Sequence, residues 1–139
     1  MVAIGIRNNN PLNIRLSNEH WEGASKNQTD KTFVVFESPE WGFNAAYQLL
    51  CTYRIKYFCR TLGSIISKYA PPAEKDTLTY IKFVCSVCRC EPETLVDIND
   101  IDFMAKFIMA ITRLENGSCP YSLGQIKKGI KLKDVKGNS

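Results

Sequence analysis

MAKFIMAITRLENG, residues 104–117, carries the clearest structural signal in this sequence. Its large apolar side chains recur at steps of three and four residues, the period of one face of an α-helix. They are Met104, Phe107, Ile108, Ile111 and Leu114. Asp100 is a typical helix N-cap, and Asn116-Gly117 is a typical helix end. The stretch therefore predicts an amphipathic helix that opens at Asp100 and closes at Gly117.

Glu115 lies on the apolar face of this predicted helix, seven residues after Ile108 and four after Ile111. Partial burial and the negative end of the helix dipole both disfavour an ionised carboxylate there. A carboxyl group that keeps its proton near neutral pH can act as a general acid. The same spacing also fits a structural carboxylate that reaches water, or pairs with Arg113 or with a lysine of the last helix.

The rest of the chain from residue 38 to residue 130 also carries helix signals. Ser or Asp stands before each apolar run but one, and Pro39 occupies a first helical position. Together with the helix above, we predict a bundle of about five helices: 41 to about 59 with Ser38 as its cap, 62–69, one capped by Asp76, and one from Ser122 to Ile130. Residues 91–99 are predicted to connect two of them.

Residues 5–37 carry a different pattern. Residues 12–15 alternate apolar and polar side chains, and residues 32–36 are β-branched and aromatic, which favours a small antiparallel sheet or hairpin. Residues 8–11, NNNP, are typical of a turn. We therefore predict one α+β domain over residues 1–139, mainly helical, with this β element first, the bundle over 38–130 and a frayed basic tail over 131–139.

Composition excludes several classes of protein. The chain has 139 residues, 45% of them hydrophobic, and a net charge of +4, which is globular and neither disordered nor coiled-coil. The basic excess is too small and too scattered to predict nucleic-acid binding, although it suits an anionic polymer. No apolar run approaches the roughly 20 residues of a membrane span, and residues 1–10 lack the apolar core of a signal peptide. We expect synthesis in the cytosol, no membrane insertion, a monomer and no cofactor.

The six cysteines allow two interpretations. Cys85, Cys88 and Cys90 form a C-x-x-C-x-C motif that could offer thiolates to zinc, but there is no second ligand pair at finger-like spacing. Reduced, buried cysteines that pack as small hydrophobic side chains are the favoured interpretation. No metal site is therefore predicted.

Three stretches resemble a known family. They are RNNNPLNIR at 7–15, WEG at 21–23 and FVVFESPEWGF at 33–43. They resemble the lysozyme-like bacterial glucosaminidases of the flagellar type. The sequence looks still more like phage-encoded proteins that begin with Arg-Asn-Asn-Asn-Pro-Gly-Asn-Ile-Arg and later carry Ala-Pro-Pro-x-Glu-Asn-x-Thr-x-x-Tyr; residues 70–80 read APPAEKDTLTY. The resemblance implies a lysozyme-like fold and cleavage of the peptidoglycan backbone, with glycan strands as the partner.

Two departures from that pattern shape the hypothesis. Leu12 stands where the phage-type pattern usually has Gly. The glucosaminidases also carry their catalytic glutamate on a helix before the Asn-rich segment, where this chain has no room for one. Residues 110–117 resemble that missing helix, so we infer a circular permutation that predicts Glu115 facing residues 8–15 across a groove.

On this hypothesis Glu115 is the general acid of a glycosidase or a lytic transglycosylase. The resemblance suggests sugar contacts from the residues Asn10, Asn13, Trp21, Tyr80 and Tyr121. A second carboxylate stays open among Glu19, Glu22, Asp30 and Glu37, and lytic transglycosylases work with a single glutamate. The enzyme would act at the bacterial cell wall and reach it through phage lysis or in the virion.

Two alternatives remain from the sequence. One is a lysozyme-like domain that has lost catalysis and serves as a structural or glycan-binding part of a virion, since a fold does not determine a function. The other is a small helical interaction protein whose resemblance is accidental. A Glu115 side chain in a cleft wide enough for a glycan strand would favour the enzyme.

Overall fold

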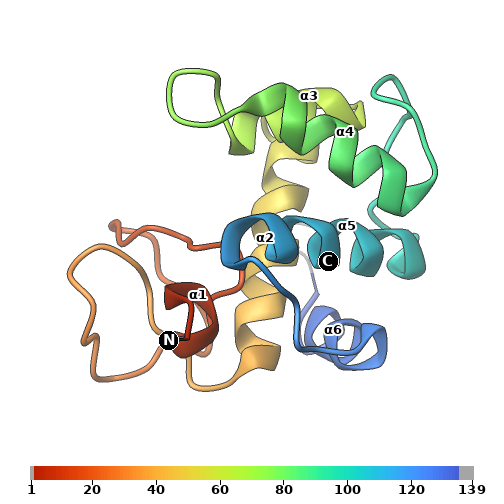
Figure 1. Cartoon of the computed structure of the whole chain (residues 1–139). Helices are drawn as coiled ribbons and strands as arrows, with labels where there is room; N and C mark the ends of the chain where they lie inside the picture. Colours follow the sequence, from red (N-terminus) through yellow and green to blue (C-terminus); the bar gives the residue numbers. More distant parts are fainter. Residues whose placement is uncertain (1, 135–139) are drawn as a thin grey trace.

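Helix α2, from Pro39 to Ile55, forms the axis of the molecule, as the computed structural model in Figure 1 shows. The structure describes residues 2–134, and this part contains six helices and no continuous strand. The other helices are α1 (Ile4–Arg7), α3 (Leu62–Tyr69), α4 (Thr77–Cys88), α5 (Ile101–Asn116) and α6 (Leu123–Ile130). The mainly helical architecture is confirmed.

The predicted caps explain where the helices begin. The Ser38 hydroxyl accepts a hydrogen bond from the Trp41 backbone N–H at 3.3 Å, and Asp76, Asp100 and Ser122 cap α4, α5 and α6 in the same way. Helix α2 ends earlier than predicted, at Ile55, because Phe58 adopts a left-handed backbone conformation (φ 56°) that turns the chain away from the helix axis. No glycine marks this turn in the sequence.

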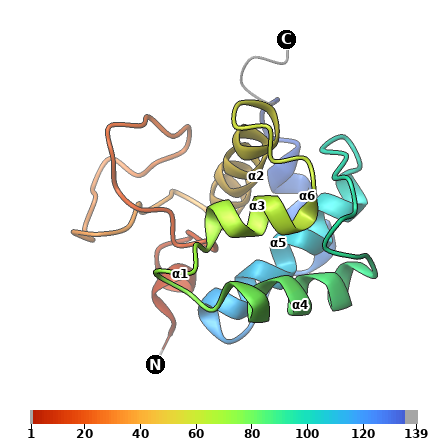
Figure 2. The same ribbon diagram turned by 90° about the horizontal axis from the view of Figure 1, so that it is seen from above.

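Helix α5 packs at the centre of the helical part. It contacts α1, α2, α4 and α6, and Figure 2 shows it between α4 and α6. Met104, Phe107, Ile108 and Ile111 are fully buried, as their spacing predicts. Gly117 ends the helix in the left-handed conformation, with φ 78°. The end of α5 is therefore fixed both by its own cap and by its neighbours.

The predicted β element is wrong in detail. Residues 4–7 form the short helix α1, and within the described chain the segment that follows makes only the isolated antiparallel bridges Arg15–Phe33 and Ala24–Phe36. Side chains complete this pairing, beside a few backbone hydrogen bonds such as that from the Val34 N–H to the Ile14 carbonyl at 2.9 Å. Gln28, for example, accepts from the Val35 N–H and donates to the Val35 carbonyl, both at 2.8 Å. A partner strand is not needed where a side chain already satisfies the backbone.

The start of the predicted tail is ordered by α2. The Asn44 amide donates to the carbonyls of Gly129, Ile130 and Lys133, and Gln48 donates to the carbonyl of Asp134 at 2.8 Å. Residues 131–134 are therefore not frayed, and residues 135–139 lie outside the described part. None of the helices between residues 2 and 134 combines the length and apolar character needed to cross a membrane.

All six cysteines are free thiols. Cys51 is buried, and the other five are half-buried. Burial raises the pKa of Cys51 and Cys88 to about 12 and that of Cys85 to about 11. These thiols are protonated at neutral pH, which fits their predicted role as small apolar side chains.

Gly42 gives a test of how tightly the Asn-rich segment packs on α2. A Cβ atom at Gly42 would lie 1.9 Å from the Asn9 carbonyl oxygen, whereas one at Gly124 on α6 would lie 3.8 Å from the nearest atom outside its neighbours. We expect Gly42→Ala to lower the free energy of unfolding by about 1–3 kcal/mol, because the added Cβ forces the Asn9 backbone to move. Gly124 lies in the first turn of α6, where Ala is the better helix former, so the control Gly124→Ala should leave this free energy unchanged or raise it by up to about 1 kcal/mol. Urea denaturation measures both, and equal effects would contradict this packing.

Candidate active site

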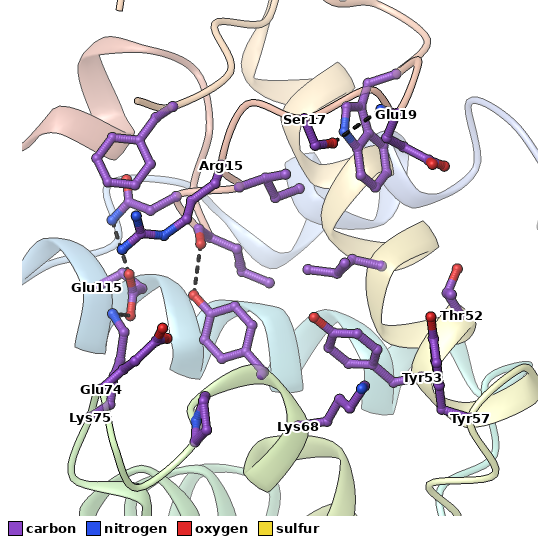
Figure 3. Close-up of a pocket in the computed structure, with 18 of the residues that line it drawn as sticks. Arg15, Ser17, Glu19, Thr52, Tyr53, Tyr57, Lys68, Glu74, Lys75 and Glu115 are labelled. Carbon is purple, nitrogen blue, oxygen red and sulfur yellow. Dashed lines mark hydrogen bonds and ion pairs between the residues drawn. The ribbon is translucent and has the colours of Figure 1, made fainter. Parts of the chain in front are cut away.

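A cleft of about 580 Å³ lies between the N-terminal segment, α2 and the α3–α4 corner (Figure 3). The N-terminal segment forms one wall, α2 and the residues after it form the floor and far end, and the loop after α3 closes the near end. Glu115, at the last turn of α5, lines the near end. The aromatic side chains along the cleft are Trp21, Phe33, Tyr53, Tyr57 and Tyr69.

Three donors surround the carboxylate of Glu115, whose side chain is only 3% exposed. Asn13 donates from Nδ2 to Oε1 at 3.0 Å, and the Lys75 ammonium lies 2.8 Å from Oε2. The Tyr80 hydroxyl also donates to Oε2. The prediction that Glu115 faces residues 8–15 is confirmed, but the two are in direct contact through Asn13, where a groove between them was predicted. The ionic partner of Glu115 is Lys75, in place of Arg113 or a lysine of α6.

A second contact joins the end of α5 to the Asn-rich segment. The Asn116 side chain donates to the Pro11 carbonyl at 2.9 Å. Asn13 itself has a left-handed backbone, with φ 52°, which Asn tolerates better than most residues. Leu12 is buried, so the departure from glycine at that position adds a side chain to the core. The turn chemistry of this segment thus aims the Asn13 amide at Glu115.

Asn10 has a structural role in place of the predicted sugar contact. It is fully buried, and its amide donates to the carbonyls of Ile14 at 3.0 Å and Val34 at 2.8 Å. Its Oδ1 accepts from the Ile14 N–H at 2.9 Å. Both amide protons are used within the segment, so Asn10 shapes the loop that carries Asn13.

The other predicted contacts divide between two places. Trp21 lines the cleft. Tyr121 does not line it: its ring packs edge-on against Phe43, with centroids 5.0 Å apart, and burial raises the pKa of its hydroxyl. Tyr121 is therefore a packing residue, and this correction follows from its position between α5 and α6.

Two tyrosines support the near end of the cleft. The Tyr69 hydroxyl donates to the Leu12 carbonyl at 2.7 Å, and its ring lies 6.4 Å from that of Tyr80. Burial raises the pKa of both hydroxyls, and the nearby Glu115 carboxylate raises them further. Both groups are thus neutral hydrogen-bond donors at physiological pH.

Of the four acidic residues considered for a second carboxylate, Glu19 lines the cleft. Glu22 pairs with Lys133 at 2.9 Å, and Asp30 accepts hydrogen bonds from Asn8 and from two backbone N–H groups. Glu74 also lines the cleft and was not considered from the sequence. Glu19 and Glu74 are therefore the acidic side chains that share the cleft with Glu115.

Lys75 is the main functional candidate that the sequence analysis missed. Lys75 stands where the phage-type pattern has Asn, and this substitution within residues 70–80 is the feature of the sequence that could have indicated it. The Lys75 side chain is 34% exposed, whereas that of its partner Glu115 is only 3% exposed. The loop between α3 and α4 therefore delivers a movable cation to the carboxylate.

A comparison with curated proteins identifies a relative. The sequence is 39% identical over 132 residues to Protein P5 of Pseudoalteromonas phage PM2, covering 93% of this chain and 81% of that protein. The chain belongs to the Protein P5 family. The predicted relation to phage-encoded proteins is confirmed at this level. No protein-family model matches the sequence.

Asn10 tests the loop that this member of the Protein P5 family uses to place Asn13. Asn10→Ala leaves two backbone carbonyls and one N–H without their buried partner, so we expect a loss of about 2–4 kcal/mol in the free energy of unfolding. The exposed Asn27 provides the control, and Asn27→Ala should cost less than about 0.5 kcal/mol. A small effect at Asn10, measured by urea denaturation, would contradict its role.

The raised thiol and hydroxyl pKa values predict a loss of stability in alkali. The unfolded chain releases the Cys51 proton near its ordinary pKa of 9.0, whereas the folded chain holds it to about 12. Stability is therefore complete below pH 9 and falls as the pH rises toward 12. We expect Cys51 to account for about 1–2 kcal/mol between pH 8 and pH 10.5.

Urea denaturation in the presence of a reductant, at several pH values in this range, measures the effect. Cys51→Ala should make the decline with pH shallower, whatever its effect at pH 8. An unchanged slope would show that Cys51 titrates alike in both states.

Proposed function

We propose that this protein cleaves the glycan backbone of peptidoglycan, as a glycosidase or a lytic transglycosylase with Glu115 as its general acid. The observation that carries the proposal is the placement of Glu115 in the wall of a cleft, in direct contact with Asn13 of the Asn-rich segment. The cleft volume is within the range of about 300–1,000 Å³ that is usual for ligand sites. The lysozyme-like fold and its circular permutation are part of this proposal.

The reaction needs a proton given at the scissile bond and then taken back. Protonated Glu115 donates its proton to the glycosidic oxygen as the bond to the anomeric carbon breaks. The acetamido oxygen of the same sugar bonds to the anomeric carbon and relieves its positive charge. A water, or in a transglycosylase the C6 hydroxyl of that sugar, then attacks the anomeric carbon, displaces the acetamido oxygen and gives its proton to the Glu115 carboxylate. Because a single glutamate suffices for this route, the transglycosylase form needs no second carboxylate.

The donors around Glu115 divide the work. Asn13 holds Oε1 and Tyr80 holds Oε2, and both come from well-packed elements. Lys75 is partly exposed and lies in the loop between α3 and α4. We infer that a bound sugar displaces the Lys75 ammonium from Oε2. Displacement of the ammonium would make Oε2 accessible to the glycosidic oxygen, so substrate binding itself would open Glu115 to the bond that is cut.

The protein would act on peptidoglycan at the bacterial cell wall, delivered by phage lysis or in the virion. No cofactor enters this scheme, and a monomer would contain the whole site.

A second candidate function is glycan binding without cleavage, in a structural part of the virion. The nearly complete burial of the Glu115 side chain and its three donors favour this alternative, because they describe an ion pair that can serve stability alone. Trp21 and the tyrosines would then supply the surface for sugars.

Substitution of the general acid tests the proposal. We expect the wild type to clear purified peptidoglycan in a turbidity assay, and Glu115→Gln to lose at least about a hundred-fold in rate, because the amide cannot donate the required proton. The exposed Glu91, outside the cleft, supplies the control, and Glu91→Gln should retain activity. Thermal melting checks that each variant is folded.

Each remaining outcome has a definite meaning. Equal clearing by wild type and Glu115→Gln would remove Glu115 from the mechanism. Failure of the folded wild type to clear peptidoglycan, combined with binding to it, would establish the second candidate.

A further inference from the structure

The end of the cleft away from Glu115 carries two cations around one aromatic ring. The Lys68 ammonium lies 4.2 Å from the centroid of the Tyr57 ring, and that of Lys56 lies 5.6 Å from it. All three side chains line the same cleft as Glu115. In Figure 3, Tyr57 and Lys68 lie at the opposite end of the cleft from Lys75 and Glu115. We call these three residues the distal cluster.

The distal cluster differs from the cation beside Glu115. Lys75 is neutralised by Glu115, whereas neither Lys56 nor Lys68 forms an ion pair with any described residue. Two ammonium groups near one ring repel each other, and an anion that binds beside them offsets this repulsion. Tyr57 is 48% exposed, so the cluster is open to a ligand.

The backbone holds the cluster in place. Lys56 caps the C-terminal end of α2, and the Tyr57 N–H bonds to the Thr52 carbonyl. Phe58, the next residue, has a left-handed backbone and turns the chain directly after Tyr57. Lys68 comes from the last turn of α3. Two different helices thus bring their cations to the same ring.

We propose that the distal cluster binds a carboxylate carried by the glycan strand, while the bond to be cut lies at Glu115. This inference rests on the proposed function, since it takes a glycan strand to occupy the cleft. Peptidoglycan has two sources of carboxylate: the peptide stem, and the lactyl group of its acidic sugar where the stem has been removed from it. Either one would give the cleft a preference for an acidic strand over a neutral polymer of N-acetylglucosamine.

Equilibrium binding of soluble strands tests the distal cluster. The protein is the full chain with Glu115→Gln, so that no strand is cut, and it is compared with and without the pair Lys56→Gln and Lys68→Gln. Three probes are used: neutral N-acetylglucosamine oligomers, glycan strands stripped of peptide, and strands with their stems. The control pair Lys82→Gln and Lys128→Gln removes the same charge from exposed positions outside the cleft.

We expect the distal pair of substitutions to weaken binding of carboxylate-bearing strands roughly ten-fold, because two solvent-exposed ion pairs are lost and each contributes only modestly to affinity. The neutral oligomer and the control pair should show no change. An effect only on the stripped strands assigns the lactyl carboxylate, and an effect only on strands with stems assigns the peptide. An effect on both shows that the cluster accepts a carboxylate from either source. Salt should reduce the difference, because it screens exposed charges.

Equal weakening of all three probes, no weakening of any, or no binding of any probe would overturn the proposal. Its failure is distinguishable from failure of the proposed function, because cleavage is measured separately with Glu115 intact. Charge-selective binding together with unaffected clearing by Glu115→Gln would retain the distal cluster and reject Glu115 as the acid. Clearing that depends on Glu115 without charge-selective binding would do the reverse.

Discussion

The junction between the end of α5 and the Asn-rich segment is the constraint on which the rest of the site depends. Asn13 donates to Glu115, and Asn116 donates to the Pro11 carbonyl. The first bond holds the Glu115 side chain, and the second joins the last residue of α5 to the backbone of the Asn-rich segment. The Lys75 and Tyr80 contacts then close around a carboxylate that is already positioned.

The helical part of the fold was predictable because its signals are local. An N-cap, an apolar period and a left-handed cap act within a few residues, and Asp100, Gly117 and Ser122 all stand where the sequence places them. The N-terminal segment was not predictable in this way. Its alternating pattern favours strands, but Asn10 and Gln28 satisfy backbone groups that a ladder would otherwise bond. Such replacement depends on tertiary positions that a pattern does not contain.

The same distinction explains the site. The period of its helix indicates Glu115, and the resemblance predicts that it faces residues 8–15, but the direct bond from Asn13 was not predicted. Tyr121 has the chemistry of a sugar contact, yet packing against Phe43 removes it from the cleft. Lys68 lies in α3 and Tyr57 follows the end of α2, so neither the spacing nor the type of these residues indicates that they meet. Long-range placement therefore decides which polar residues become a site.

The sequence distance across the junction has a consequence for synthesis. Asn13 and Glu115 are 102 residues apart, so most of the chain must leave the ribosome before the two side chains can meet. Contacts of such wide separation also slow folding, because a long loop must close before they form. A nascent chain therefore holds the Asn-rich segment for most of its translation without the carboxylate that completes it, and the assembled groove is a late product of biogenesis.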